Sequence, residues 1–189
     1  MVRGAVNSVG IDTISAYTAS ARIEGFANSF GDSGGAATSI FIAQNEGADH
    51  KERVREGMRT SMSMMVLLGA ELSGIMVITA GGAMGLMLGN NTQTALHLGI
   101  QYIAGISVFY ALCHIGNAFV GYYRGVGMVN VPVIGTVLHI SICVILSYLL
   151  VPHMGLLAVA VATGIGWIAV VLFQSVLYFR KNPWTKAEK

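Results

Sequence analysis

Charged side chains are scarce in this sequence. Only 11% of its 189 residues are Asp, Glu, Lys or Arg, whereas soluble domains average roughly 25%. From Gly125 to Phe179 there is none at all. A bilayer-spanning helix needs about 20 mostly apolar residues, so this stretch is long enough for two spans joined by a short turn at residues 151–153. The scarcity of charge excludes an ordinary soluble domain.

Cysteine and the common catalytic motifs are also rare or missing. The two cysteines, Cys113 and Cys143, lie in apolar stretches, which excludes a disulfide framework and a zinc site made of cysteine alone. There is no phosphate-binding glycine loop, no zinc-protease motif and no persuasive Ser/His/Asp set. The sequence therefore predicts no enzyme and no cofactor. The basic residues border the apolar stretches, as at a membrane face, so a nucleic-acid partner is excluded as well.

Apolar residues, by contrast, make up 54% of the chain, and its 24 glycines suit helices that pack closely in lipid. The sequence predicts an all-α, polytopic membrane helix bundle, a single membrane domain over residues 1–189. We expect about five full transmembrane helices and one truncated N-terminal helix. The predicted spans are residues 2–19 (partial), 21–43, 61–88, 98–122, 128–150 and 154–177.

The distribution of positive charge predicts how these spans are oriented. Short connections rich in Lys and Arg remain in the cytoplasm. The 46–59 stretch, the connection at Arg124 and the tail from Arg180 are basic, whereas the connections at 89–92 and 151–153 carry no Lys or Arg. Basic connections thus follow every second span. We expect a multi-pass protein of the plasma membrane, embedded in the lipid bilayer with its C-terminus in the cytoplasm.

Polar side chains at membrane depth are the candidate functional residues, because they are costly there. Glu71 is the only acid between Arg59 and the predicted fifth span. Its carboxylate could bind a cation or exchange a proton, or it could simply face a hydrated cavity. In the next span, Tyr110 precedes His114 by four residues and Asn117 follows it by three, so the three share one helix face. With the neighbouring Cys113, this polar stripe is predicted to line a cavity.

Two further polar groups allow more than one interpretation. His139 interrupts the 128–150 span and is a candidate cavity residue, although a lone histidine in a span is more often satisfied by a neighbouring carbonyl. Glu24 and Asp32 lie close to several glycines. Such glycines could mark an unwound helix, as at transporter sites, but helix packing is the simpler interpretation. It applies also to two close-approach motifs, Gly81-x-x-x-Gly85-x-x-x-Gly89 and Gly121-x-x-x-Gly125.

Two sequence elements resemble a known family of transporters. The 21–43 span is followed by a signature made of Gln44, Asn45, Gly47 and Ala48, after which a basic loop begins. Arg124-Gly125 precedes the penultimate span. These elements are similar to those of the multidrug and toxic compound extrusion (MATE) family. The resemblance covers essentially the whole chain, in the order of the family's C-terminal half.

The resemblance implies both a fold and a function. Family members have twelve spans in two six-helix lobes, so this chain would supply the end of the seventh span and spans eight to twelve. A missing N-terminal lobe would then be its partner, and the chain a truncated transporter. Members export cationic, amphipathic, drug-like compounds in exchange for Na+ or H+. Some carry a tyrosine and an acid in the tenth span, where this chain has Tyr110 and His114, and relatives often have an arginine near the position of Cys143.

Two other functions remain open at this stage. The chain could be a membrane remnant of a truncated gene that transports nothing. It could also be a flippase for lipid-linked polysaccharides from the same superfamily. Flippases tend to have more cationic cavities than this chain's nearly uncharged spans suggest, so this alternative ranks behind the other two.

Overall fold

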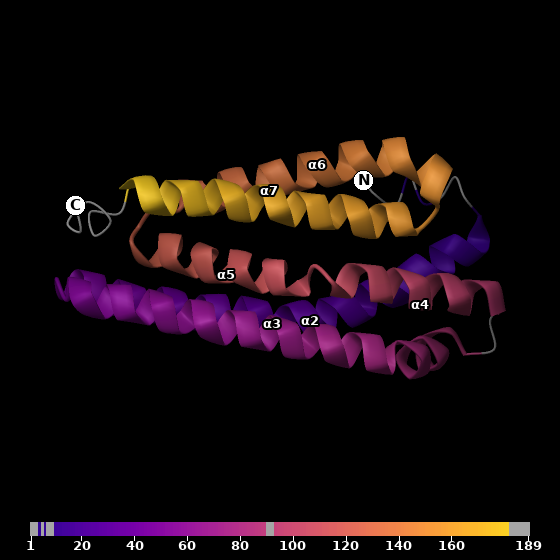
Figure 1. Ribbon diagram of the computed structural model, residues 1–189, viewed down its shortest axis with the longest axis horizontal. Helices are drawn as coiled ribbons and strands as arrows, with labels where there is room; N and C mark the ends of the chain where they lie inside the picture. Colours follow the sequence, from indigo (N-terminus) through magenta and orange to yellow (C-terminus); the bar gives the residue numbers. More distant parts are fainter. Residues whose placement is uncertain (1–3, 5, 7–9, 90–92, 182–189) are drawn as a thin grey trace.

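The computed structural model describes residues 4, 6, 10–89 and 93–181, which form a bundle of long helices lying side by side (Figure 1). No strand occurs among these residues, which confirms the predicted all-α class. The helices are α2 (Ile11–Gly47), α3 (Lys51–Leu88), α4 (Gln93–Ser107), α5 (Tyr110–Gly125), α6 (Asn130–Met154) and α7 (Leu157–Lys181).

Three of these helices, α3, α6 and α7, are long and apolar enough to cross a membrane. The pair α4 and α5 meets the same test as one span that is bent by 51°. The outward faces of the bundle carry many large apolar side chains, such as Leu86 (85% exposed) and Ile78 (84% exposed). A soluble protein rarely exposes so much apolar surface, so these faces fit contact with lipid.

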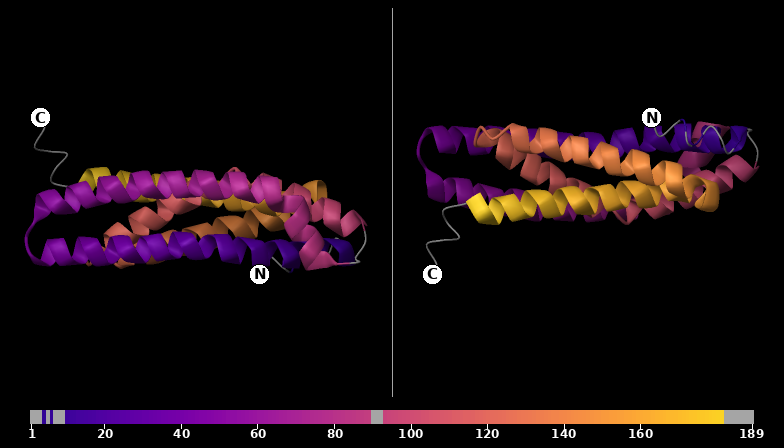
Figure 2. Two further views of the ribbon diagram at one scale, coloured as in Figure 1. Left: turned by 90° about the horizontal axis from the view of Figure 1, so that it is seen from below. Right: turned by 90° about the horizontal axis from the view of Figure 1, so that it is seen from above.

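Helix α2 differs from the predicted spans. It runs without interruption from Ile11 to Gly47, so the predicted boundary between a partial 2–19 span and a 21–43 span is wrong. The first part of that partial span lies outside the described residues. Arg22, Glu24 and Asp32 give α2 a mixed polarity, and it does not pass the length and composition test that α3, α6 and α7 pass. It nevertheless extends along the bundle beside α3 (Figure 2).

Most of the predicted basic loop is helical. The connection between α2 and α3 consists only of Ala48, Asp49 and His50, and α3 begins at Lys51. Because a helix rises 1.5 Å per residue, the 38 residues of α3 extend over about 57 Å, well beyond the roughly 30 Å of a hydrocarbon core. The charged first turns of α3 therefore extend the helix outside the membrane.

The turn between α6 and α7 also lies later than predicted. Helix α6 continues through Pro152 to Met154, and the chain reverses at Gly155, whose φ is 59°. A residue without a Cβ adopts this left-handed conformation readily. Pro152 is tolerated because it lies in the last turn of the helix, so the turn predicted at residues 151–153 is displaced by a few residues.

The basic residues gather at one end of the bundle. The α2–α3 turn, the α5–α6 turn and the end of α7 lie together on the left in Figure 1, and the α6–α7 turn, the end of α3 and the start of α4 lie at the opposite end. Lys51, Arg124 and Arg180 thus belong to the same end. This is the arrangement that the alternation of basic connections predicts.

Glycines bring α2 and α5 into close contact. A Cβ on Gly121 would overlap the carbonyl oxygen of Gly35, and one on Gly125 would lie 2.6 Å from Cβ of Ile42. The close-approach interpretation of the Gly121-x-x-x-Gly125 motif is therefore confirmed. The other motif behaves differently, because a Cβ on Gly85 or Gly89 would meet no atom within 4 Å among the described residues. Its close-approach interpretation is wrong.

Candidate functional site

A small cavity lies in the interior of the bundle, where the α4–α5 span is broken. Its volume is about 200 Å³, and side chains from α2, α4, α5, α6 and α7 surround it. The residues that line it are Glu24, Asn28, Ile106, Phe109, Tyr110, Cys113, His139, Thr163 and Trp167. Five helices thus contribute to one partly enclosed space that is lined by polar and apolar side chains.

Contacts with other helices hold the break in place. Helix α4 ends at Ser107 and α5 begins at Tyr110, although neither Gly nor Pro lies between them. The hydroxyl of Ser73 on α3 donates a hydrogen bond of 2.6 Å to the carbonyl of Ser107, which the break leaves without its usual helical partner. The ring of Phe109 packs on Gly164 of α7. The break is therefore a product of tertiary packing.

Glu24 is the acidic group of the cavity. The hydroxyl of Tyr102 forms a hydrogen bond with its carboxylate, and the hydroxyl of Tyr110 donates to its backbone carbonyl at 3.3 Å. The thiol of Cys113 donates to Oδ1 of Asn28 at 3.6 Å. No Lys or Arg lines the cavity. A carboxylate partly withdrawn from water gains from a proton or a cation, and side-chain oxygens of Asn28, Tyr110 and Thr163 line the same cavity.

His139 closes the cavity on the side of α6 and α7. Its ring lies against the indole of Trp167, with 4.5 Å between the ring centroids. The sulfur of Cys143 is 3.6 Å from Nε2 of His139 and donates to the carbonyl of Ala162 at 3.6 Å. His139 is thus a wall residue held by an aromatic ring and a thiol.

The predicted polar stripe on α5 divides between two environments. Tyr110 and Cys113 face the cavity, whereas His114 is fully buried and packs against Gly31 of α2 together with Asn117. Nδ1 of His114 lies 2.9 Å from the carbonyl oxygen of Tyr110. Its Nε2 has no hydrogen-bond partner among the described residues. Only half of the stripe therefore lines the cavity.

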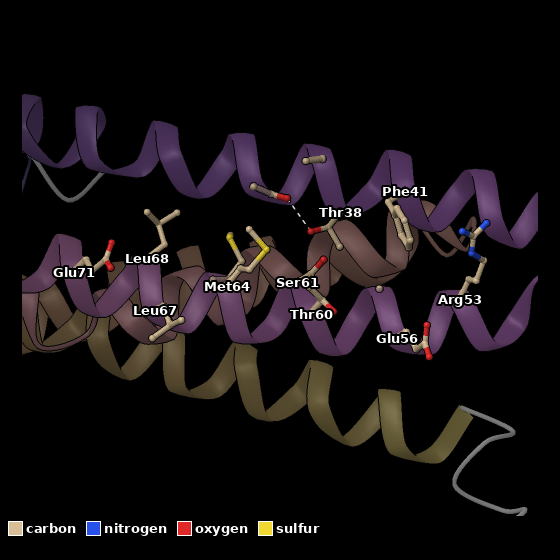
Figure 3. Close-up of a pocket in the computed structure, with 14 residues that line it drawn as sticks. Thr38, Phe41, Arg53, Glu56, Thr60, Ser61, Met64, Leu67, Leu68 and Glu71 are labelled. Carbon is tan, nitrogen blue, oxygen red and sulfur yellow. Dashed lines mark hydrogen bonds between the residues drawn. The ribbon is translucent and has the colours of Figure 1, made fainter.

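Glu71 lies apart from this cavity. It is exposed and stands at one end of an open groove of about 840 Å³ between α2 and α3 (Figure 3). Met64 and Leu68 line the middle of the groove, and Arg53 and Glu56 lie at its other end. The structure therefore separates Glu71 from Tyr110 and His139.

The residues of the family signature build turns at the basic end. The amide of Asn45 donates to the carbonyl of Phe41 at 2.8 Å, and the backbone N–H of Ala48 donates to the carbonyl of Gln44 at 3.2 Å. Gly47 is the last residue of α2. Arg124 and Gly125 end α5, and Gly125 packs on α2 as described above. These residues end helices and take no part in the cavity.

Comparison with known proteins identifies the family. The family model MatE matches residues 2–149, most of the chain. The chain belongs to the MatE (MATE) family. A probable multidrug resistance protein, YoeA of Bacillus subtilis (strain 168), is 28% identical over 184 residues, which are 93% of this chain and 39% of YoeA.

Solved structures of MATE proteins share the fold. An inward-facing multidrug resistance MATE family transporter of the MOP superfamily superposes with a TM-score of 0.86 at 21% identity, over 94% of this chain and 40% of the other. A MOP superfamily transporter from Pyrococcus furiosus Vc1 gives a TM-score of 0.85 at 21% identity, over 95% of this chain and 39% of the other. The MATE chain described here thus spans about two fifths of the length of the relatives it matches.

Sequence reasoning missed part of the cavity. The sequence favours helix packing for the glycines near Glu24 and leaves the role of Glu24 open, and it singles out neither Asn28 nor Trp167 as a site residue. One signal was available, since Glu24 and Asn28 are four residues apart and therefore share a face of α2. No comparable signal reveals Trp167, because only the fold brings α7 to the broken span.

Proposed function

We propose that this chain is the C-terminal lobe of a twelve-helix MATE transporter that exports cationic, amphipathic compounds in exchange for Na+ or H+. The family supports transport, and the name of the Bacillus relative supports multidrug resistance as its outcome. A separate N-terminal lobe would be the partner, since the relatives are about two and a half times as long as this chain.

The observation that carries the proposal is the half-buried carboxylate of Glu24 in this partly enclosed cavity. Among the residues that line the cavity it has no cationic partner, and the hydroxyl of Tyr102 is its hydrogen-bond donor. A carboxylate that is partly withdrawn from water gains from a proton or a hard cation. Exchange of that ion is the step that could couple transport to an ion gradient.

The neighbouring residues have supporting roles in this proposal. Side-chain oxygens of Asn28 and Thr163 line the same space as Glu24 and could complete the coordination of Na+. No group of three His, Cys, Asp or Glu side chains converges among the described residues, so the donors would be mainly neutral oxygens. His139 and Trp167 form the opposite wall and limit the access of water.

The same proposal includes an orientation. The end of the bundle with the α2–α3 turn, the α5–α6 turn and the end of α7 carries most of the basic residues that the structure describes. Because Lys and Arg remain on the cytoplasmic side, this end and the C-terminus would lie in the cytoplasm. The cavity would then open toward either side as the lobes move against each other.

The test is gradient-coupled efflux of a cationic dye from cells that lack their own efflux pumps. The chain is co-expressed with a separately encoded N-terminal lobe of a MATE relative, and efflux is followed before and after the Na+ or H+ gradient is dissipated. We expect Glu24→Gln to abolish the gradient-dependent part. The matched control, Glu71→Gln, removes an acid from the exposed groove and should retain it. Both proteins are quantified in the membrane fraction.

The results separate the two parts of the proposal. If wild-type chain and lobe give no efflux in any pairing, the transport function is wrong. If efflux depends on a gradient but Glu24→Gln retains it, the transport function stands and Glu24 is removed from the coupling step. Loss in Glu71→Gln alone would move the coupling site to the groove between α2 and α3.

A further inference from the structure

Arg22 lies away from the end of the bundle at which the other described basic side chains gather. The other arginines and the lysine whose side chains the structure describes, Lys51, Arg53, Arg55, Arg59, Arg124 and Arg180, all belong to the basic end. Arg22 lies in the opposite half of α2, where a groove of about 270 Å³ also contacts Met87 and Leu88 at the far end of α3. A cation there departs from the distribution that orients the bundle.

No acid of the described chain neutralises Arg22. Its guanidinium is exposed and makes no ion pair or hydrogen bond within the described residues. Glu24, two residues further along, points to a different side of the helix and is bonded to Tyr102 inside the bundle. Asp12 lies ten residues away, about 15 Å along the helix axis, and has an interaction of its own. Within the part of the chain that the structure describes, the five donors of the guanidinium therefore have no partner and could bind a ligand.

The groove around Arg22 contains further hydrogen-bond donors. Thr18 and Ser15 lie four and seven residues before Arg22, so their hydroxyls follow the same face of α2, and both side chains line the groove. A planar guanidinium flanked by hydroxyls matches the geometry of a phosphate group. The last carbonyls of α3 are also near and favour a cation, but Arg22 forms no hydrogen bond to them.

Apolar surface continues from the groove toward the middle of the bundle. Phe26 lies four residues after Arg22 on the same helix face and is 71% exposed, and Phe30 beyond it is 41% exposed. Their rings meet edge to face with centroids 5.4 Å apart. Polar donors near the end of the bundle, followed by aromatic rings at greater depth, reproduce the order of a headgroup and its acyl chains.

We propose that Arg22, Thr18 and Ser15 bind the phosphate of an anionic phospholipid in the leaflet opposite the basic end, with its acyl chains along Phe26 and Phe30. The amphipathic order favours a lipid over free phosphate, because an inorganic ion would gain nothing from the exposed rings. The site is separate from the cavity at Glu24. Its occupant fills the groove between α2 and the end of α3.

The proposal is tested on the 189-residue chain, purified in mild detergent and depleted of lipid. Binding of dioleoyl phosphatidylglycerol is measured by native mass spectrometry and is compared with dioleoylglycerol, which has the same chains and no phosphate. Inorganic phosphate is added as a competitor. The variant is Arg22→Gln, and the matched control is Arg59→Gln, which removes an exposed arginine from the basic end.

We expect wild type to bind phosphatidylglycerol about tenfold more tightly than Arg22→Gln does, the size expected for the loss of a hydrogen bond to a charged group. Arg59→Gln should bind as wild type does. Dioleoylglycerol should bind wild type no better than phosphatidylglycerol binds Arg22→Gln. Inorganic phosphate at the lipid's concentration should not displace the lipid.

Three results would overturn the proposal. Equal affinity of wild type and Arg22→Gln for phosphatidylglycerol would leave Arg22 free for another partner, such as a carboxylate of a second protein chain. Equal binding of phosphatidylglycerol and dioleoylglycerol to wild type would exclude phosphate recognition, and this comparison needs no variant to fold. Displacement by inorganic phosphate at equal concentration would assign the groove to a free anion.

Discussion

The close contact between α2 and α5 predicts both the direction and the magnitude of the change in stability in Gly121→Ala. In Gly121→Ala, the new Cβ would overlap the carbonyl oxygen of Gly35 and lie 2.8 Å from Cβ of Thr38. The opposing oxygen is backbone, so relief requires the two helices to separate. We therefore expect Gly121→Ala to destabilise the chain, whereas the same substitution at an open helical position should stabilise it.

The magnitude follows from two opposing contributions. Overpacking a tight site costs about 1–3 kcal/mol, and replacing glycine by alanine inside a helix gains about 0.8–1 kcal/mol. Because the opposing atom is a backbone oxygen that cannot move aside alone, the upper part of the overpacking range, about 2–3 kcal/mol, applies, and the net loss in Gly121→Ala is about 1–2 kcal/mol. Gly74 of α3 is the matched control, because a Cβ there would meet no atom within 4 Å. Gly74→Ala should gain about 1 kcal/mol.

The assay is thermal unfolding of the purified chain in detergent, followed by circular dichroism. At about 2–4 °C per kcal/mol for a chain of this size, Gly121→Ala should unfold roughly 5–10 °C below Gly74→Ala. If both variants shift upward together, or if Gly121→Ala is indistinguishable from wild type, α2 and α5 do not approach as closely as described. The glycine argument would then fail for this helix pair.

Two further predictions concern the broken span and the thiols. Ser73→Ala removes the hydrogen bond to the carbonyl of Ser107 and should lower the free energy of unfolding by about 1 kcal/mol. The control is Ser63→Ala, because the hydroxyl of Ser63 bonds to Arg59 of its own helix. An equal shift of the thermal unfolding midpoint in both variants would contradict the role of Ser73. Cys113 and Cys143 are buried free thiols, so a membrane-permeant maleimide should label them slowly in the folded chain and completely after denaturation, as counted by mass spectrometry. Rapid labelling of both thiols in the folded chain would show that these helices do not enclose them.

The sequence predicted correctly those features of the fold that depend on composition alone. The uncharged stretch from Gly125 to Phe179 predicted two helices, and α6 and α7 occupy it almost end to end. The basic stretches predicted which turns lie together. The predicted positions of the connections were less accurate. A helix continues past the membrane boundary whenever its polar residues can be hydrated, as the start of α3 does.

The break between α4 and α5 could not be predicted from local sequence. Ser107, Val108 and Phe109 include no helix breaker, and the stabilising contacts come from Ser73 and Gly164, far away along the chain. The surroundings of Glu24 depend on the same break, since its cavity lies where the α4–α5 span is broken. Glycine motifs were informative only in part, because a close approach requires a facing helix. Gly121 has one and Gly85 does not.

The arrangement of the last two helices has a consequence for how the protein is made. Helix α6 packs chiefly against α7, and the two are joined by the short reversal at Gly155. Because they follow α4 and α5 in the chain, they leave the ribosome after them, can enter the bilayer together as a hairpin and then dock on α4 and α5, mainly through α7. His139, Thr163 and Trp167 belong to this hairpin. During synthesis, the carboxylate of Glu24 therefore stays open on one side until α6 and α7 have been inserted.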